Sequence, residues 1–75
     1  MVSNTLKSNR LKIDGMTQAQ LAEFVGITVQ HYQRIEYGKS LPSVTLALRI
    51  AAALGVSVED LYPLPREGQP KITDN

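Results

Sequence analysis

The chain has 75 residues, no cysteine and a formal net charge of +1. A chain this short holds one domain, the lack of cysteine excludes disulfides and thiolate metal sites, and so small a charge is not that of a nonspecific nucleic-acid binder. The longest apolar stretch, residues 50–56, is far short of the roughly 20 residues that cross a bilayer. We therefore expect a cytoplasmic protein with no membrane association, no metal and no cofactor.

The first of the expected helices covers residues 3–14. Val2, Leu6 and Ile13 fall near one face of this segment, and Gly15 follows as a stop signal. No segment of the chain alternates apolar and polar residues between turn residues, as a half-buried strand does. The sequence therefore predicts an all-α protein.

The second and third helices have the clearest boundaries. Thr17–Gln20 matches a capping box, in which the Thr hydroxyl and the Gln side chain satisfy each other's backbone N–H groups. Gly26 supplies the left-handed residue that ends this helix. The third helix begins at Thr28, runs to about residue 37 and is ended by Gly38. These signals predict two short helices joined by a glycine-containing corner.

The remaining elements are a fourth and a short fifth helix. Ser43 caps residues 44–54, which Gly55 ends, and residues 57–62 form the fifth helix. Prolines and a glycine then interrupt residues 63–75, which we expect to be a tail outside the domain of residues 1–62. The expected core stripe of the fourth helix is Val44, Ala47, Ile50, Ala51 and Leu54. The sequence thus predicts a compact five-helix domain.

Two short helices with a glycine corner and a polar outer face on the second are typical of a helix-turn-helix. A major groove about 12 Å wide admits one helix, and there glutamine pairs with adenine and arginine with guanine. The outer face of the third helix offers Gln30, Gln33 and Arg34 for such contacts, and Val29 beside them is placed to touch a thymine methyl. The sequence predicts that these four residues read bases in double-stranded DNA.

Residues 16–62 resemble the lambda-repressor/Cro (xenobiotic-response-element) family of helix-turn-helix proteins. Many matched positions at fixed spacing make the resemblance specific. The matched positions are Thr17, Gln18, Leu21, Ala22, Gly26, Ile27, Thr28, Ile35, Glu36, Gly38, Pro42, Ser43, Ile50, Ala51, Leu54, Gly55 and Val56. The resemblance implies a lambda-repressor-like fold and a DNA-binding transcriptional regulator, most often a repressor.

The resemblance also implies roles for single positions. Gln18 would bond the DNA backbone and support a neighbouring base-reading glutamine, and Glu36 would pair with Arg10, although Arg10 lies one residue farther from Gly15 than in the family. The other expected backbone contacts are Thr17, His31, Tyr37, Gly38 and Lys39. For the side chains of His31, Tyr37 and Lys39 the alternative is solvation without a DNA contact.

Apolar residues are in surplus toward the end of the chain, at Leu46, Ala53, Leu61, Tyr62 and Leu64. We expect them to form a two-fold dimer surface; in the alternative, some complete the core of the monomer. The favoured function is a homodimeric repressor on a pseudo-palindromic operator. The alternative is an antitoxin or antirepressor-like module that binds a protein partner. An enzyme is not expected, because the chain has no nucleophile–base pair or phosphate loop.

Overall fold

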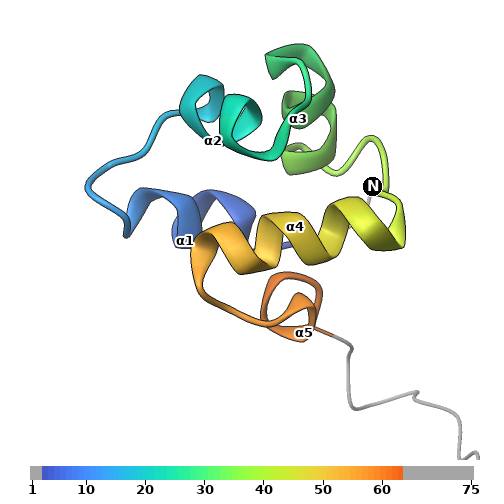
Figure 1. The fold of residues 1–75 in the computed structure, drawn as a ribbon. Coiled ribbons are helices and arrows are strands. Elements are labelled where there is room, and N and C mark those ends of the chain that lie inside the picture. The colour runs from blue at the N-terminus through green and yellow to red at the C-terminus, as the bar shows by residue number, and fades with distance from the viewer. Residues whose placement is uncertain (1–2, 64–75) are drawn as a thin grey trace, which may run out of the picture.

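The computed structural model describes residues 3–63, and within them all regular structure is helical. The elements are α1 (Leu6–Leu11), α2 (Gln18–Val25), α3 (Val29–Glu36), α4 (Val44–Leu54) and α5 (Val58–Leu61). Helices α2 and α3 form one side of the molecule, α1 and α4 cross its middle, and α5 lies on the other side (Figure 1). The predicted all-α, five-helix fold is confirmed. Residues 64–75 of the expected tail of residues 63–75, Leu64 included, lie outside the described residues.

Side-chain caps fix the starts of the helices that follow α1. The Thr17 hydroxyl accepts the N–H of Gln20 at 3.0 Å, and the side-chain Oε1 of Gln20 accepts the N–H of Thr17 at 2.9 Å. The hydroxyls of Thr28 and Ser43 accept the N–H three residues further on. Each cap satisfies a backbone donor that the first turn of a helix leaves free, so the predicted starts of α2, α3 and α4 are confirmed.

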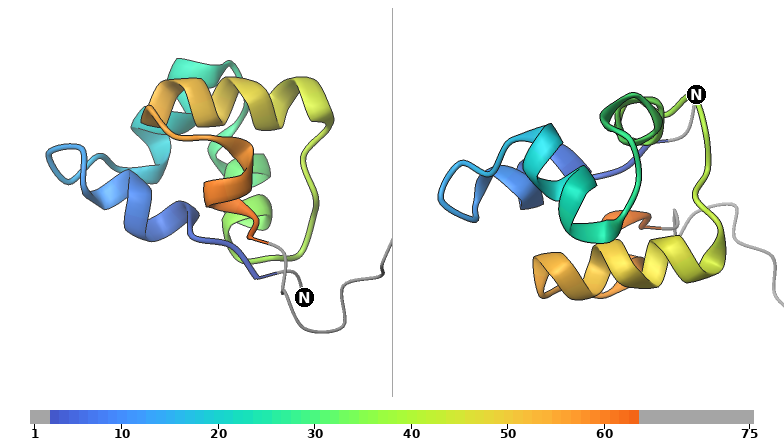
Figure 2. Two further views of the ribbon diagram at one scale, coloured as in Figure 1. Left: turned by 90° about the horizontal axis from the view of Figure 1, so that it is seen from below. Right: turned by 45° about the horizontal axis from the view of Figure 1, so that its top comes forward.

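Helix α1 is shorter than the predicted range of residues 3–14. The Asn4 side chain accepts the N–H of Leu6 at 3.0 Å, so the helix begins only there. The N–H of Thr5 bonds the carbonyl of Leu61 at 3.0 Å, which joins this segment to α5 (Figure 2). Side chains that bond nearby backbone compete with helix formation, and two residues in the left-handed conformation, Asp14 and Gly15, follow the helix. These features explain why α1 covers Leu6–Leu11 and not residues 3–14.

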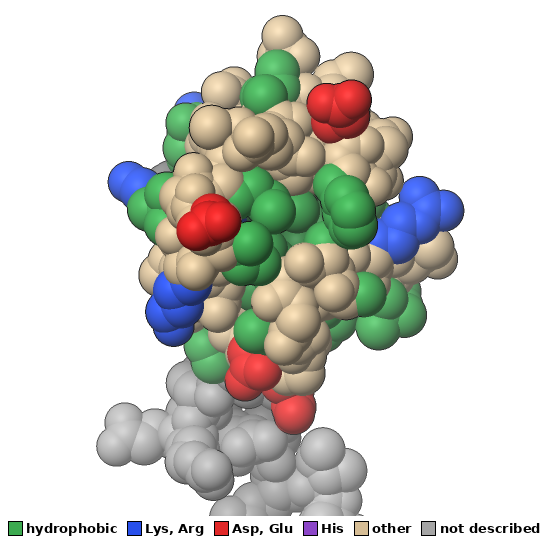
Figure 3. All heavy atoms as spheres, turned by 60° about the vertical axis from the view of Figure 1, so that its left-hand side comes forward, with side chains coloured by type: hydrophobic (Ala, Val, Ile, Leu, Met, Phe, Trp, Pro, Cys, Tyr) green, Lys and Arg blue, Asp and Glu red, His purple; other side chains and the backbone are tan. Residues whose placement is uncertain are grey.

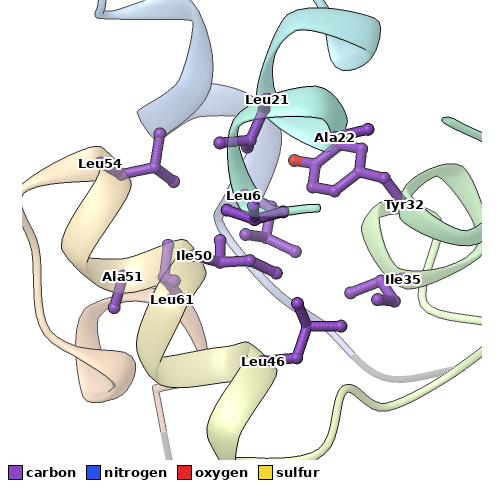
Figure 4. Close-up of a cluster of buried hydrophobic side chains, with 11 residues drawn as sticks. Leu6, Leu21, Ala22, Tyr32, Ile35, Leu46, Ile50, Ala51, Leu54 and Leu61 are labelled. Carbon is purple, nitrogen blue, oxygen red and sulfur yellow. The ribbon is translucent and has the colours of Figure 1, made fainter. Parts of the chain in front are cut away.

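One hydrophobic core receives side chains from all five helices (Figure 4). Tyr32 and Ile35 of α3 are fully buried in it, as the sequence predicted, and Ile27 at the corner packs against it while half-buried. Burial of this many apolar side chains is the main term that favours folding. The core consists of Leu6, Leu21, Ala22, Val25, Tyr32, Ile35, Leu46, Ile50, Ala51, Leu54 and Leu61.

The structure corrects two assignments in the C-terminal half. Leu46 and Leu61, which were predicted to form a dimer surface, are 8% and 0% exposed and complete the core of the monomer. Val44, which was predicted to belong to the core stripe of α4, is 77% exposed. The rest of the predicted stripe is buried, and Leu46 takes the place of Val44 where α4 packs between α2 and α5. Ala53 and Tyr62 are half-buried.

The surface that carries the connection between α1 and α2 has a mixed character. Hydrophobic side chains gather at the centre of this face, and lysine, arginine and acidic side chains lie toward its edges (Figure 3). No helix among the described residues is long and apolar enough to span a membrane. Charged groups around an apolar centre are ordinary for the surface of a small domain.

Candidate nucleic-acid interface

Helices α2 and α3 form a unit with a rigid corner. Gly26 adopts a left-handed conformation with φ of 83°, and its N–H bonds the carbonyl of Ala22 at 2.9 Å. A left-handed residue without strain requires glycine here. On the next helix, Tyr32 and Ile35 are 0% exposed and fix which side of α3 faces the core. The opposite side of α3 is therefore displayed outward in one orientation.

The outward side of α3 carries the predicted base-reading residues. Gln30 and Arg34 are exposed, lie one helical turn apart and make no side-chain hydrogen bond within residues 3–63. Val29 is half-buried at the start of the same helix, and Gln33 is half-buried beside α2. An uncommitted amide and an uncommitted guanidinium on one helical face have the donor and acceptor groups that base edges in the major groove require.

A buried ion pair joins α1 to the end of α3. Arg10 Nε lies 2.9 Å from Glu36 Oε1, Arg10 Nη2 lies 3.2 Å from Oε2, and the two side chains are 7% and 3% exposed. Arg10 Nη1 also donates to the carbonyl of Met16 at 2.6 Å, and the Tyr32 hydroxyl donates to Glu36 Oε1 at 2.8 Å. The structure thus brings Arg10 and Glu36 together despite the unusual spacing before Gly15.

The ion pair keeps Glu36 ionised. Burial alone would raise the pKa of its carboxyl, but hydrogen bonds from Arg10, Tyr32 and Gln18 together lower that pKa below its usual value. Burial raises the pKa of the Tyr32 hydroxyl, so this group remains a donor. An ionised carboxylate only accepts hydrogen bonds, and every neighbour that bonds Glu36 must therefore present a donor.

The need for a donor at Glu36 orients Gln18, and Gln18 in turn orients Gln33. Gln18 Nε2 donates to Glu36 Oε2 at 2.8 Å, so its Oε1 points the other way and accepts from Gln33 Nε2 at 3.0 Å. Gln33 Oε1 is then left without a partner among the described residues. The second hydrogen of the Gln18 amide is directed at the Tyr37 hydroxyl, 3.3 Å away. Gln18 therefore links the buried carboxylate to Gln33 of α3, which is the neighbouring glutamine that the resemblance led us to expect beside it.

Some of the residues expected to contact the DNA backbone are used within the fold, and others are exposed. The Thr17 hydroxyl serves as a cap, and the amides of Gly38 and Lys39 donate to carbonyls of α3 at 3.1 and 2.8 Å. These two amides are occupied at the helix end, so the side chain of Lys39, which is exposed, is the group left to meet a phosphate. His31 and Tyr37 are also exposed.

Sequence reasoning missed the polar role of Tyr32. It assigned this residue to the core, where the ring does lie, but the hydroxyl bonds Glu36 from one turn earlier on the same helix. The spacing of a tyrosine four residues before a glutamate was the available signal, because such pairs lie side by side on a helix. Tyr32 therefore helps to hold the carboxylate that orients Gln18.

The chain is similar to proteins described as transcriptional regulators. An uncharacterized regulator of Methanothermobacter thermautotrophicus is 45% identical over 85% of this chain and 94% of its own length. The cryptic phage CTXphi transcriptional repressor RstR of Vibrio cholerae is 37% identical over 72% of this chain, which spans 48% of that repressor. The structure of the clp gene regulator ClgR from Corynebacterium glutamicum superposes with a TM-score of 0.67 and 33% identity, covering 73% of this chain and 57% of ClgR.

A likeness to an enzyme is confined to part of that enzyme. Hydroxypropylphosphonic acid epoxidase from S. wedmorenis gives a TM-score of 0.69 and 34% identity over 77% of this chain, but over 30% of its own chain. The helix-turn-helix family, in contrast, matches residues 6–61, which is most of this chain. With its capped α2, glycine corner and outward-facing α3, the chain belongs to the lambda-repressor/Cro type of helix-turn-helix DNA-binding domains.

Proposed function

We propose that this protein regulates transcription by binding a specific double-stranded DNA sequence with α3 in the major groove. The observation that carries the proposal is the contrast between the two sides of α3. Tyr32 and Ile35 fix the inner side in the core, while Gln30 and Arg34 on the outer side have no partner within the described residues. A helix held in one orientation, with outward side chains that are uncommitted in hydrogen bonding, suits the reading of base edges.

The face divides into base-reading and positioning groups. Arg34 has a fork that fits the O6 and N7 of guanine, Gln30 fits adenine, and Val29 provides an apolar contact for a thymine methyl. Gln33 contributes a carbonyl oxygen whose direction is set by Gln18. Lys39, in the loop after α3, supplies a charge for a phosphate, which strengthens binding without reading sequence.

The regulator acts as a repressor and binds as a homodimer. A pseudo-palindromic operator with half-sites about 34 Å apart matches two copies related by a two-fold axis. The similarity to a phage repressor supports repression, although the matched region is about half of that repressor. A domain this small reads few base pairs, and pairing two copies doubles the sequence that is read.

The test is selection of binding sites from random duplex DNA, followed by titrations of two variants. Arg34→Ala should cost about 1–3 kcal/mol per half-site and remove the preference at one base position. Lys39→Ala should weaken binding to all sequences alike and reduce the slope of log K against log salt concentration by about one.

Both variants change one exposed cation, so each is the control for the other. If selection yielded no consensus sequence, the proposal of sequence-specific regulation would be wrong. If Arg34→Ala lowered affinity equally on all sequences, Arg34 would be a phosphate contact, and Gln30, Gln33 and Val29 would carry the specificity.

A further inference from the structure

A chain of hydrogen bonds leads from the buried carboxylate of Glu36 to the surface of α3. Glu36 Oε2 accepts from Gln18 Nε2 at 2.8 Å, and Gln18 Oε1 accepts from Gln33 Nε2 at 3.0 Å. The side chain of Glu36 is 3% exposed, whereas Gln33 is half-buried. Both bonds are donated toward Glu36, so the chain has a direction, and its outer end lies at Gln33.

The direction of this chain is set at Glu36. Arg10 donates to both carboxylate oxygens, at 2.9 and 3.2 Å, and the Tyr32 hydroxyl donates to Oε1 at 2.8 Å. Burial raises the pKa of the Glu36 carboxyl, but the bonds that it accepts outweigh burial and leave this pKa below its ordinary value. An ionised carboxylate has no proton to donate. A reversed Gln18 amide would therefore place its oxygen against a carboxylate oxygen with no hydrogen between them.

The other partners of Gln18 permit either orientation of its amide. Among the described residues, the side chains of Glu36, Tyr37 and Gln33 bond the Gln18 side chain. The Tyr37 hydroxyl, 3.3 Å from Gln18 Nε2, can donate as well as accept, and the Gln33 amide can turn its oxygen or its nitrogen inward. Glu36 is thus the partner that fixes which way the Gln18 amide points.

The fixed direction decides what Gln33 offers to DNA. Its Nε2 is committed to Gln18 Oε1, so its Oε1 is the amide atom turned away from Gln18. An outward oxygen accepts a hydrogen bond, whereas an outward nitrogen would donate one. In the major groove adenine and cytosine present an amino donor, and guanine and thymine present acceptors without an amino group.

We propose that the buried carboxylate of Glu36, acting through Gln18, makes Gln33 select bases that carry an amino group, adenine or cytosine. The inference rests on the proposed function, because it requires α3 in the major groove. A glutamine with a free amide serves both classes of base, since a half-turn about its last bond exchanges oxygen and nitrogen. Glu36 removes that choice and so acts as a positioning residue for specificity from inside the fold.

The first experiment locates the base and tests its class. Binding sites are selected from random duplex DNA, and Gln33→Ala identifies the position at which the preference of the wild-type protein is lost. The wild-type protein should prefer adenine or cytosine there, by roughly two- to tenfold in Kd, which is the effect of one hydrogen bond. The same duplex carrying that base without its amino group should bind the wild-type protein more weakly by a similar factor, and should bind Gln33→Ala unchanged.

A second variant reverses the chain without removing the ion pair. Gln18→Lys places an ammonium group, which only donates, between Glu36 and Gln33. The Gln33 amide must then turn its oxygen inward and its nitrogen outward, so the preference should change to guanine or thymine. The added charge should strengthen binding to all sequences alike, and the ratio of Kd values between bases therefore isolates the change in preference.

A third protein removes the group that sets the direction. Arg10→Met combined with Glu36→Met leaves Gln18 with partners that permit both orientations, so the preference at the Gln33 position should shrink toward none. The preference set by Arg34 should stay, which a general loss of structure would not allow. Circular dichroism compares the helical content of each variant with that of the wild-type protein.

Nuclear magnetic resonance tests the direction without DNA. In the wild-type protein the side-chain amide protons of Gln18 should give Overhauser contacts to the ring of Tyr37, because Gln18 Nε2 lies 3.3 Å from the Tyr37 hydroxyl oxygen. Contacts to the side chain of Gln33 in their place would mean that the chain runs the other way, and would overturn the inference.

Three further results would overturn it. They are a wild-type preference for guanine or thymine at the Gln33 position, an unchanged preference in both Gln18→Lys and the double methionine variant, and a Gln33→Ala variant that keeps the full consensus sequence. Each of these results leaves a consensus in place, so the proposed function would stand while the role of Glu36 falls. Selection that yields no consensus would instead contradict the proposed function, and the inference with it.

Discussion

Helices α3 and α4 both pack against the core, but their outer sides differ in chemical character. Each has one side in the core, through Tyr32 and Ile35 on α3 and through Leu46 and Ile50 on α4. On the outer side α3 displays amides and a guanidinium, whereas α4 displays Val44 and Leu48. A surplus of hydrogen-bonding groups suits base edges, and a surplus of apolar surface suits another protein. The same small fold thus presents chemically different surfaces through two helices.

The inner sides of the two helices differ as well. The end of α3 is held by a charged network around Glu36, while α4 is held by aliphatic packing. A charged network depends on every partner, because a buried charge left unpaired is costly. Aliphatic packing depends instead on volume and shape. Substitutions on the inner side of α3 should therefore destabilise the fold through unpaired charge, and those on the inner side of α4 through lost packing.

The largest effect is expected where the network is broken. Glu36→Ala leaves the guanidinium of Arg10 buried without its carboxylate, and should lower the free energy of unfolding by about 3–5 kcal/mol. For a domain of this size that is a large part of the total stability. Urea denaturation followed by circular dichroism measures the change.

The matched control removes both charges. Arg10→Met combined with Glu36→Met replaces the pair by apolar side chains of similar length, and should be much less destabilised than Glu36→Ala. If the double variant were as unstable as the single one, packing at these positions, and not the unpaired charge, would account for the loss.

Two leucines of α4 test the aliphatic side. Leu46→Ala should cost about 2–5 kcal/mol, because the side chain is 8% exposed and its removal leaves a cavity. Leu48→Ala, the same change two residues away at a side chain that is 58% exposed, should stay within about 0.5 kcal/mol in the monomer. Equal losses from the two variants would mean that the inner side of α4 has been misassigned.

The boundaries of α2, α3 and α4 were predictable because their signals are local. A hydroxyl at the cap and a glycine after the last turn act within one helical turn, as at Thr17, Gly26 and Ser43. The start of α1 was mispredicted although one of its determinants, the bond from the Leu6 N–H to Asn4, is local; the other, the contact between Thr5 and the distant Leu61, cannot be read from nearby residues. Local chemistry can be read from the sequence, whereas contacts across the fold cannot.

The inner side of α4 was predicted correctly at Ala47, Ile50, Ala51 and Leu54, whereas Val44 was assigned to it in place of Leu46. Nine of the positions in VTLALRIAAAL are apolar, so helical periodicity defines more than one apolar stripe and only the neighbouring helices decide which is buried. The outer side of α3 was easier, because polar and apolar residues separate cleanly there. The ion pair of Arg10 and Glu36 and the support of a neighbouring glutamine by Gln18 came from the family resemblance, whereas the bonds of Gln18 and Tyr32 to Glu36 required coordinates.

Acid should weaken the network without any substitution. The pKa of Glu36 in the folded protein lies below its ordinary value of 4.5, so the unfolded chain takes up its proton first as the pH falls. The contribution of Glu36 to stability is therefore complete above about pH 4.5 and is lost as the pH falls through the lower folded pKa. Urea midpoints measured from neutral pH downward should fall in that range.

A variant without Glu36 separates its contribution to the acid dependence of stability from that of other carboxyl groups. Hydrogen bonds from the backbone and side chain of Ser57 also lower the pKa of Asp60. Protonation of Asp60 therefore lowers stability in acid in the same direction as protonation of Glu36. The variant with Arg10→Met and Glu36→Met keeps Asp60 and should lose less stability in acid than the wild-type protein. An identical acid dependence in both proteins would show that Glu36 does not titrate as the structure implies.

The smallest effect is expected at Gln18, where the polar network meets the reading helix. Gln18→Met keeps the length of the side chain but removes the amide that accepts from Gln33 at 3.0 Å. The Gln33 side chain would then lose its fixed direction, and binding should weaken by about 0.5–1.5 kcal/mol, the net value of one hydrogen bond. The loss should appear as a broader base preference at the position that Gln33 contacts, with the preference set by Arg34 unchanged.

A double-mutant cycle decides whether Gln18 acts through Gln33. If it does, Gln18→Met should have little further effect once Gln33→Ala is present, since the group that it orients is gone. If instead Gln18 itself bonds a phosphate, the two losses should add, and Gln18→Met should weaken binding to all sequences alike. Both donors of the Gln18 amide are directed at Glu36 and Tyr37, so a phosphate contact would require one of these bonds to break. The cycle therefore distinguishes a residue that orients a reader from one that contacts the DNA backbone.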